Sequence, residues 1–206
     1  MPDPSHLLLF VAALTAVYLL PGPDMALVIA SSSLQGVRHG LMAALGLALS
    51  RTLHVTLSAL GLAALFHAHP LLFDLVRWLG AAYLLFLAWK LCRAGAGERP
   101  APGAGAGAGW AALKRGFLTN LLNPKALMFC ALLLPQFISA RHELAGQYLL
   151  LGAILVSLGL LFDGLYALAA ARLARRLAAG PVPRLPRLLF SGVFGFAALR
   201  LAWGGQ

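Results

Sequence analysis

The sequence predicts an all-α integral membrane protein with six transmembrane helices, arranged as two inverted repeats of three helices each. Hydrophobic residues fill 61% of the 206 positions and charged residues only 11%, which is more apolar surface than one soluble core can hide. The apolar residues also gather into runs close to the ~20 residues that cross a bilayer. These runs are residues 7–29, 41–66, 71–91, 117–137, 147–171 and 188–203.

The first and last apolar runs differ from the others in what precedes them or in their length. No basic stretch precedes residues 7–29, so we expect this run to stay as a span and not to be removed as a signal peptide. Residues 188–203 are few for a span and include Gly192, Gly195 and Arg200, so they cross only with little tilt or in a thinned bilayer. Five spans are the alternative to six.

Basic residues predict the orientation of the chain. The net charge of +10 comes largely from residues between the apolar runs, where the positive-inside rule places them in the cytoplasm, so it does not indicate a nucleic-acid partner. The basic residues of the loops expected to be cytoplasmic are Arg38, Arg93, Arg99, Lys114, Arg115, Arg172, Arg175, Arg176, Arg184 and Arg187. With six spans, both termini lie outside.

A stretch rich in alanine, glycine and proline divides the chain. Residues 94–109 cannot form a core and are predicted to be a flexible cytoplasmic linker. Residues 1–93 then form the first three-helix repeat and residues 110–206 the second. An odd number of spans in each half inverts the second half relative to the first, and each half has a helix-breaking proline near its start, Pro21 and Pro124.

The first apolar run is interrupted by Pro21-Gly22-Pro23-Asp24. Each proline removes a backbone donor and its ring clashes with the preceding turn, so the helix must break or kink here. Freed backbone groups and a carboxylate are costly in hydrocarbon unless they face protein or water. We therefore expect this break to line a cavity.

The second run carries a polar helix face. Gly46, Ser50, His54 and Ser58 recur every four residues, and Arg51 lies three before His54. An arginine this deep in an apolar helix should point into the bundle, toward a carboxylate or an anionic ligand. A structural ion pair for Arg51 and a buried packing role for His54 are the alternatives.

Two further polar groups fall in the second half. Asn123-Pro124-Lys125 predicts a helix start, whose free amides and positive dipole end suit a carboxylate. Asp163 is a second intramembrane acid, with Tyr166 one turn later.

These residues lie in stretches that together resemble the LysE/RhtB-type amino-acid exporter family over nearly the whole chain. The matching stretches are Pro21-Gly22-Pro23, the Gly36 to Gly40 turn, Gly46 with His54, RWLGAAYLLFLAWK from Arg77, GFLTNLLNPKA from Gly116, LLPQF from Leu133 and Tyr166-Ala167. Ser50 and Arg51 depart from the family pattern. The resemblance implies an exporter of amino acids or close derivatives from the bacterial cytoplasm, in the inner membrane, driven by the proton-motive force and without a cofactor.

Under that interpretation the partners are a small-molecule substrate, coupling protons and the lipid bilayer, and a homo-oligomer stays open. Asp24, His54 or Asp163 would carry the proton, because histidine titrates near neutral pH and an isolated buried acid tends to be neutral. Asp163 is the first choice. An amino-acid zwitterion, the substrate that the resemblance implies, needs opposite charges at both ends in a dry cavity, so we expect Arg51 and the helix start after Pro124 to hold its carboxylate while Asp24 faces its ammonium.

Three alternatives stay open at the level of sequence. Ser50 and His54 are spaced as a nucleophile and base of an intramembrane enzyme, without a recognisable elbow motif. His67 and His69 give thin support to a metal exporter. A structural or signalling membrane protein is the third, although buried charges are expensive for it. Cys92 and Cys130 lack the spacing of a metal site or a disulfide framework.

Overall fold

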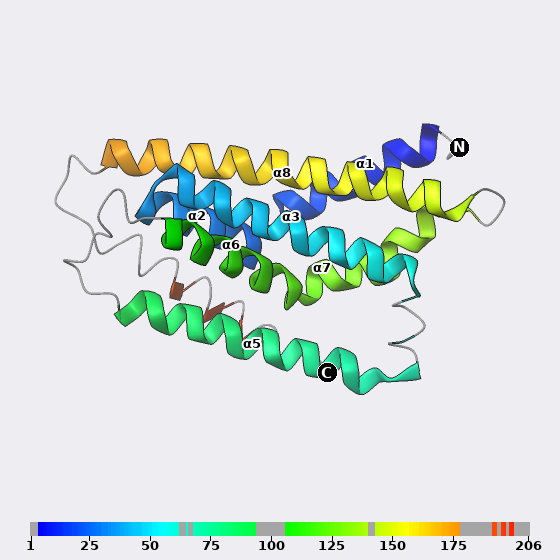
Figure 1. Cartoon of the computed structure of the whole chain (residues 1–206), viewed down its shortest axis with the longest axis horizontal. Coiled ribbons are helices and arrows are strands. Elements are labelled where there is room, and N and C mark those ends of the chain that lie inside the picture. The colour runs from blue at the N-terminus through cyan, green and yellow to red at the C-terminus, as the bar shows by residue number, and fades with distance from the viewer. Residues whose placement is uncertain are drawn as a thin grey trace.

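All the regular structure in the described part of the chain is helical, as Figure 1 shows for the computed structural model. The structure describes residues 4–61, 65, 68–93, 106–139, 143–177, 191–192, 195–196 and 198–199. Its helices are α1 (Pro4–Leu19), α2 (Pro23–Gln35), α3 (Val37–Ala59), α5 (Pro70–Arg93), α6 (Ala106–Leu121), α7 (Pro124–Met128), η1 (Phe129–Leu133), η2 (Leu134–Phe137) and α8 (Leu144–Leu177).

These helices confirm an all-α membrane protein and supply two to four candidate spans. Within the described residues, α3 and α8 are each long and apolar enough to cross a bilayer. The other two candidates are bent pairs, α1 with α2 and α6 with the helical stretch that ends at Phe137. Most of the predicted sixth run, residues 188–203, lies outside the described residues.

The two bent spans break in the same way. α1 and α2 meet at 55°, and the second pair meets at 56°. In both, a proline occupies the first helical position after the break, Pro23 in α2 and Pro124 in α7. Proline is favoured there because its missing N–H would have no partner in the first turn. The helix-breaking role predicted for both motifs is therefore confirmed.

The predicted linker extends too far toward the C-terminus. α6 begins at Ala106, so the last positions of the stretch 94–109 are helical. Alanine has the highest helix propensity, and Trp110 and Leu113 give the helix apolar side chains to continue it. The fourth span consequently begins before Phe117, at Gly107. Residues 94–105 lie outside the described part of the chain.

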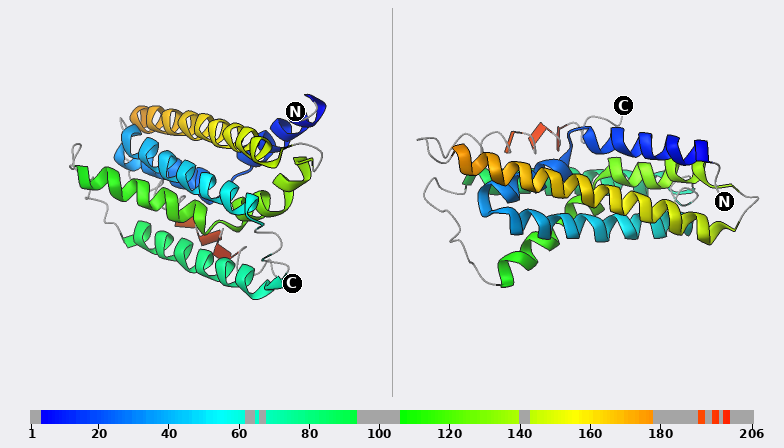
Figure 2. Two further views of the ribbon diagram at one scale, coloured as in Figure 1. Left: turned by 45° about the vertical axis from the view of Figure 1, so that its right-hand side comes forward. Right: turned by 90° about the horizontal axis from the view of Figure 1, so that it is seen from above.

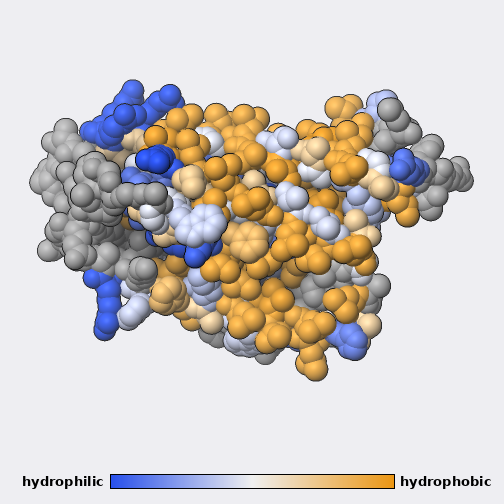
Figure 3. All heavy atoms as spheres, viewed as in Figure 1, coloured by the Kyte–Doolittle hydropathy of each residue, from blue (hydrophilic) through white to orange (hydrophobic). Residues whose placement is uncertain are grey.

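The helices lie roughly side by side, with α5 and α8 on opposite sides of the bundle in Figures 1 and 2. Exposed hydrophobic side chains form a broad band across the middle of the molecule, as expected for a surface that faces lipid (Figure 3). Hydrophilic side chains gather at the end where α8 finishes with Arg175 and Arg176. The candidate site lies in the middle of this bundle.

Two glycines let α3 and α6 approach closely. A Cβ at Gly46 would overlap the carbonyl oxygen of Leu113, and one at Gly116 would overlap the carbonyl oxygen of Ala43. Small residues of this kind bring helix backbones together in membranes. The contact fixes the position of Arg51, which lies little more than one turn beyond Gly46 on α3.

We expect Gly46→Ala to destabilise the folded protein by at least ~1–3 kcal/mol, because the atoms it meets are backbone and cannot rotate away. The loss would appear as a lower thermal midpoint of the purified protein in detergent. Gly107→Ala on α6 is the control, since a Cβ there has no atom within 4 Å. Equal midpoints for the two variants would contradict the close contact.

Candidate functional site

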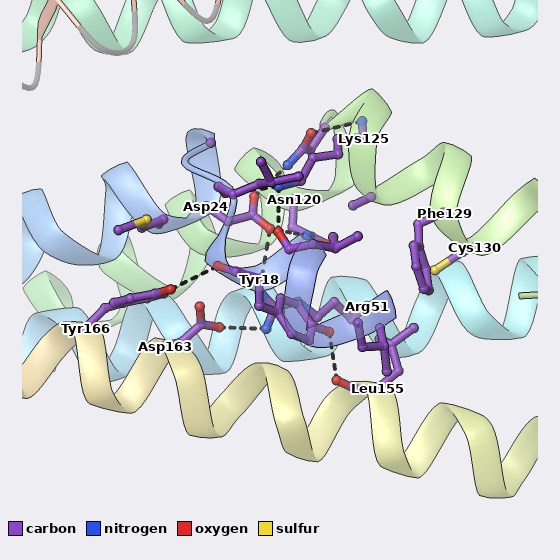
Figure 4. Close-up of a pocket in the computed structure, with 17 residues that line it drawn as sticks. Tyr18, Asp24, Arg51, Asn120, Lys125, Phe129, Cys130, Leu155, Asp163 and Tyr166 are labelled. Carbon is purple, nitrogen blue, oxygen red and sulfur yellow. Dashed lines mark hydrogen bonds and ion pairs between the residues drawn. The ribbon is translucent and has the colours of Figure 1, made fainter. Parts of the chain in front are cut away.

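A cavity of about 50 Å³ lies where the two broken spans meet (Figure 4). This is room for a few water molecules. Its lining comes from both sides of both breaks and from α3 and α8. Residues that line this cavity include Tyr18, Asp24, Arg51, Asn120, Asn123, Lys125, Phe129, Cys130, Leu155, Asp163 and Tyr166.

Arg51 is the central cation of the cavity. Its Nη1 donates to Oδ2 of Asp163 at 2.6 Å, and its Nη2 lies 3.5 Å from Oδ2 of Asp24. The Arg51 and Asp163 side chains are each only 4% exposed. The Tyr18 ring covers the guanidinium, with its centroid 5.1 Å from Cζ. Removing one partner of such a buried pair leaves an uncompensated charge and costs ~3–5 kcal/mol.

Asp24, at the first break, is held by side chains at the second break. Asn120 and Asn123, on either side of the second break, donate their Nδ2 groups to its two carboxylate oxygens at 2.6 and 2.9 Å. The Oδ1 of Asn123 accepts from the amide of Lys125 at 3.1 Å and so caps α7. One asparagine therefore fixes both its own helix start and the acid of the other span.

Lys125, which follows the second break, contacts the backbone at the first break. Its Nζ donates to the carbonyl oxygens of Val17 at 2.9 Å and Leu20 at 3.3 Å, at the end of α1. In a continuous helix, the Val17 carbonyl would accept from residue 21, but Pro21 has no N–H to donate. Tyr166 likewise donates its hydroxyl to the Tyr18 carbonyl at 2.9 Å. Side chains from the second half thus satisfy the backbone that the first break leaves open.

The structure separates the predicted site residues into three groups. Those that line the cavity are Gly22, Asp24, Arg51, Asn123, Lys125, Asp163 and Tyr166. Pro21, Pro23 and Pro124 act on the backbone at the breaks. Ser50 and His54 belong to neither group: both are fully buried but lie outside the lining.

Ser50 and His54 make no hydrogen bond to each other in the structure. The Ser50 hydroxyl and both imidazole nitrogens of His54 make no hydrogen bond to each other or to other described groups, although the backbone of Leu121 faces the imidazole. The described residues also contain no cluster of three or more His, Cys, Asp or Glu side chains that could hold a metal. His67 lies outside the described residues.

Sequence reasoning missed Tyr18 and Asn120. Tyr18 covers Arg51 and donates its hydroxyl to the Leu155 carbonyl at 2.8 Å. Asn120 is fully buried and contacts Asp24. Both stand about one turn before a break, at Pro21 and at Asn123, and a polar side chain so placed in an apolar run was the available signal.

Gly159 leaves the space that Arg51 occupies. A Cβ at this position would lie 2.5 Å from Nη1 of Arg51 and 3.0 Å from the Tyr18 hydroxyl. We expect Gly159→Ala to push the guanidinium off Asp163 and to reduce the activity that depends on this cavity at least tenfold, a loss equivalent to about 1.4 kcal/mol. The flexible end of arginine can move, so folding should be largely preserved.

Gly164→Ala is the matched control on the same helix, because a Cβ there has no atom within 4 Å. The activity of the two variants is compared at equal amounts of inserted protein. Wild-type activity in Gly159→Ala would mean that the position of Arg51 is not critical.

Comparison with known proteins assigns the chain to a family. A model of the "LysE type translocator" family matches residues 15–205. The chain belongs to the LysE-type translocator family. Its Pro21-Gly22-Pro23 and Asn123-Pro124-Lys125 motifs form the two breaks of the fold, so the motifs behind the predicted family resemblance are the ones that build the cavity.

Similar bacterial proteins match over most of the chain. An uncharacterized membrane protein of Vibrio cholerae serotype O1 is 32% identical over 191 residues, covering 92% of this chain and 93% of the relative. The homoserine/homoserine lactone efflux protein of Salmonella typhimurium is 33% identical over 161 residues, or 78% of each. The leucine efflux protein of Klebsiella pneumoniae is 34% identical over 131 residues, or 63% of this chain and 62% of the relative. No solved structure matches significantly.

Proposed function

We propose that this LysE-type translocator exports amino acids or close derivatives from the bacterial cytoplasm across the inner membrane, driven by the proton-motive force. The observation that carries the proposal is the buried cluster of Asp24, Arg51 and Asp163 in a cavity between two broken spans. Charged side chains inside a membrane are energetically expensive, and where they do occur they commonly mark the pathway of a substrate or an ion. The efflux proteins among the relatives support the substrate class.

The charges suggest how a zwitterion is held. We assign the substrate carboxylate to Arg51, where it would replace a carboxylate of the protein, and the ammonium to Asp24. Arginine suits this role because its planar guanidinium binds carboxylates through two parallel hydrogen bonds. The start of α7 is a weaker candidate than the sequence indicates, because the Lys125 amide is already bonded to Asn123.

The overall topology we propose has six spans in two inverted repeats, with both termini outside. The equal bends of 55° and 56° support it, as do the prolines that open α2 and α7. In this arrangement the Ala/Gly/Pro-rich linker is cytoplasmic. A periplasm-active alkaline phosphatase fused at Gly105 should therefore be inactive, and full activity would reverse the orientation.

The decisive test of function is transport by the purified protein in proteoliposomes. With a pH gradient imposed, labelled leucine or homoserine should move against its concentration gradient, and collapsing the gradient should stop net movement. Liposomes without protein provide the control for passive leakage. If a panel of labelled amino acids and homoserine lactone shows no protein-dependent movement, the proposal is wrong.

A further inference from the structure

We infer that the substrate carries an uncharged, apolar side chain, and that Phe129 and Cys130 determine how large it can be. The inference rests on the proposed function, since it divides the cavity into one end for the charged groups of an amino acid and another for its side chain. It concerns a part of the cavity that the ion pairs of Arg51 do not reach.

The cavity is chemically different on its two sides. Asp163 and Tyr166 lie on one side of Arg51, while Phe129 and Cys130 lie on the other (Figure 4). Phe129 and Cys130 are 5% and 3% exposed and belong to a core cluster that also contains Phe10, Leu14, Leu151 and Leu155. Leu14 and Leu155 also line the cavity. This side is therefore an apolar wall with packed side chains behind it.

Local backbone chemistry holds Phe129 and Cys130 at the wall. Pro135 has no N–H for the preceding turn, and residues Phe129–Leu133 form a π-helix in which the Leu134 amide donates to the Phe129 carbonyl. The Cys130 carbonyl, which would accept that amide in an α-helix, instead accepts from the Ser58 hydroxyl of α3. A bond from α3 thus fixes the π-helical turn against the helix that carries Arg51.

The wall excludes a second charge on the substrate. The charged groups of the cavity, Asp24, Arg51, Lys125 and Asp163, already engage one another, Asn120, Asn123 or the end of α1. An ammonium or carboxylate placed beside Phe129 would lose its water without gaining a partner, which is strongly unfavourable. An alkyl side chain would instead bury apolar surface there.

Binding to the full-length protein in detergent tests both parts of the inference. Unlabelled leucine, norleucine, lysine and phenylalanine compete with labelled leucine for wild type, Phe129→Ala and Phe129→Leu. Norleucine and lysine have unbranched side chains that differ chiefly by the terminal ammonium. We expect lysine to bind at least ~100-fold more weakly than norleucine, because its ammonium is buried unpaired.

Enlarging the wall should change the preference for size. Phe129→Ala should raise the affinity for phenylalanine relative to leucine by ~10-fold or more, the usual effect of a pocket that gains or loses one to a few carbon atoms. Phe86→Ala is the control, because Phe86 is 50% exposed on α5 and lies outside the cavity. It should leave the ratio unchanged.

The outcomes separate the inference from the function on which it rests. No binding of any amino acid by wild type contradicts the proposed function itself. If lysine binds as tightly as norleucine, the inference that the substrate has an uncharged side chain is wrong. An unchanged ratio of phenylalanine to leucine affinity in Phe129→Ala overturns the role of Phe129. If Phe129→Ala fails to fold, the conservative Phe129→Leu decides by the same ratio.

Discussion

Arg51→Lys should bind substrate ~10- to 100-fold more weakly than wild type, because one or more hydrogen bonds between charged groups are lost. Lysine keeps the positive charge that Asp24 and Asp163 need, so the protein should still fold. Its single ammonium cannot reproduce a bidentate contact with a carboxylate. It also cannot satisfy both aspartates from the position beneath Tyr18.

The measurement is equilibrium binding of labelled leucine to purified protein, with the thermal midpoint recorded on the same samples. Arg115→Lys is the matched control, since Arg115 lies outside the cavity and donates to Ala111 and Gln35. If Arg51→Lys folds normally and binds substrate with unchanged affinity, Arg51 serves only in a structural ion pair and the substrate binds elsewhere.

Asp163→Asn should abolish transport driven by a pH gradient. An amide has the shape of the carboxyl group but cannot take up and release a proton. Exchange of labelled for unlabelled substrate needs no net proton movement and should continue. The two activities, measured in the same proteoliposomes, would then separate, with gradient-driven transport falling by at least ~100-fold if protonation is obligatory for the cycle.

Glu143→Gln serves as the control, because Glu143 stands before α8 and outside the cavity. The proton would have to be carried by Asp24 or His54 if Asp163→Asn kept normal gradient-driven transport. Asp24→Asn would then be the next variant, since Asp24 lines the cavity and His54 does not.

Sequence patterns predicted the helix breaks well because their cause is local. Prolines at 21, 23 and 124 act on their own turn of backbone, whatever packs around them. Intramembrane charges could be recognised singly for the same reason, since an isolated charge in an apolar run needs a partner. These two signals located the helices and residues that meet at the cavity.

The pairing of those charges could not be predicted. Arg51 and Asp163 are 112 positions apart, and Asp24 is 96 and 99 positions from its two asparagines. The contact of Arg51 with Asp163 depends on how α3 packs against α8, and those of Asp24 depend on the angle at each break, neither of which a pattern encodes. Periodicity also placed Ser50 and His54 on one broad face with Arg51, but the helix surface divides here: Arg51 faces α8, whereas the His54 imidazole faces the backbone of Leu121 near the end of α6.

The crossed contacts of Asp24 and Lys125 bear on how the protein behaves without cargo. In the proposed transport cycle, any opening that parts the two breaks would separate Lys125 from the end of α1 and Asp24 from its asparagines. Each hydrogen bond to a charged group contributes ~1.5–3 kcal/mol, so these bonds together oppose idle cycling of an empty carrier. A zwitterion brings its own charges and can replace some of these bonds as they break. We therefore expect a low proton leak in the absence of substrate, because these hydrogen bonds oppose opening of the empty cavity.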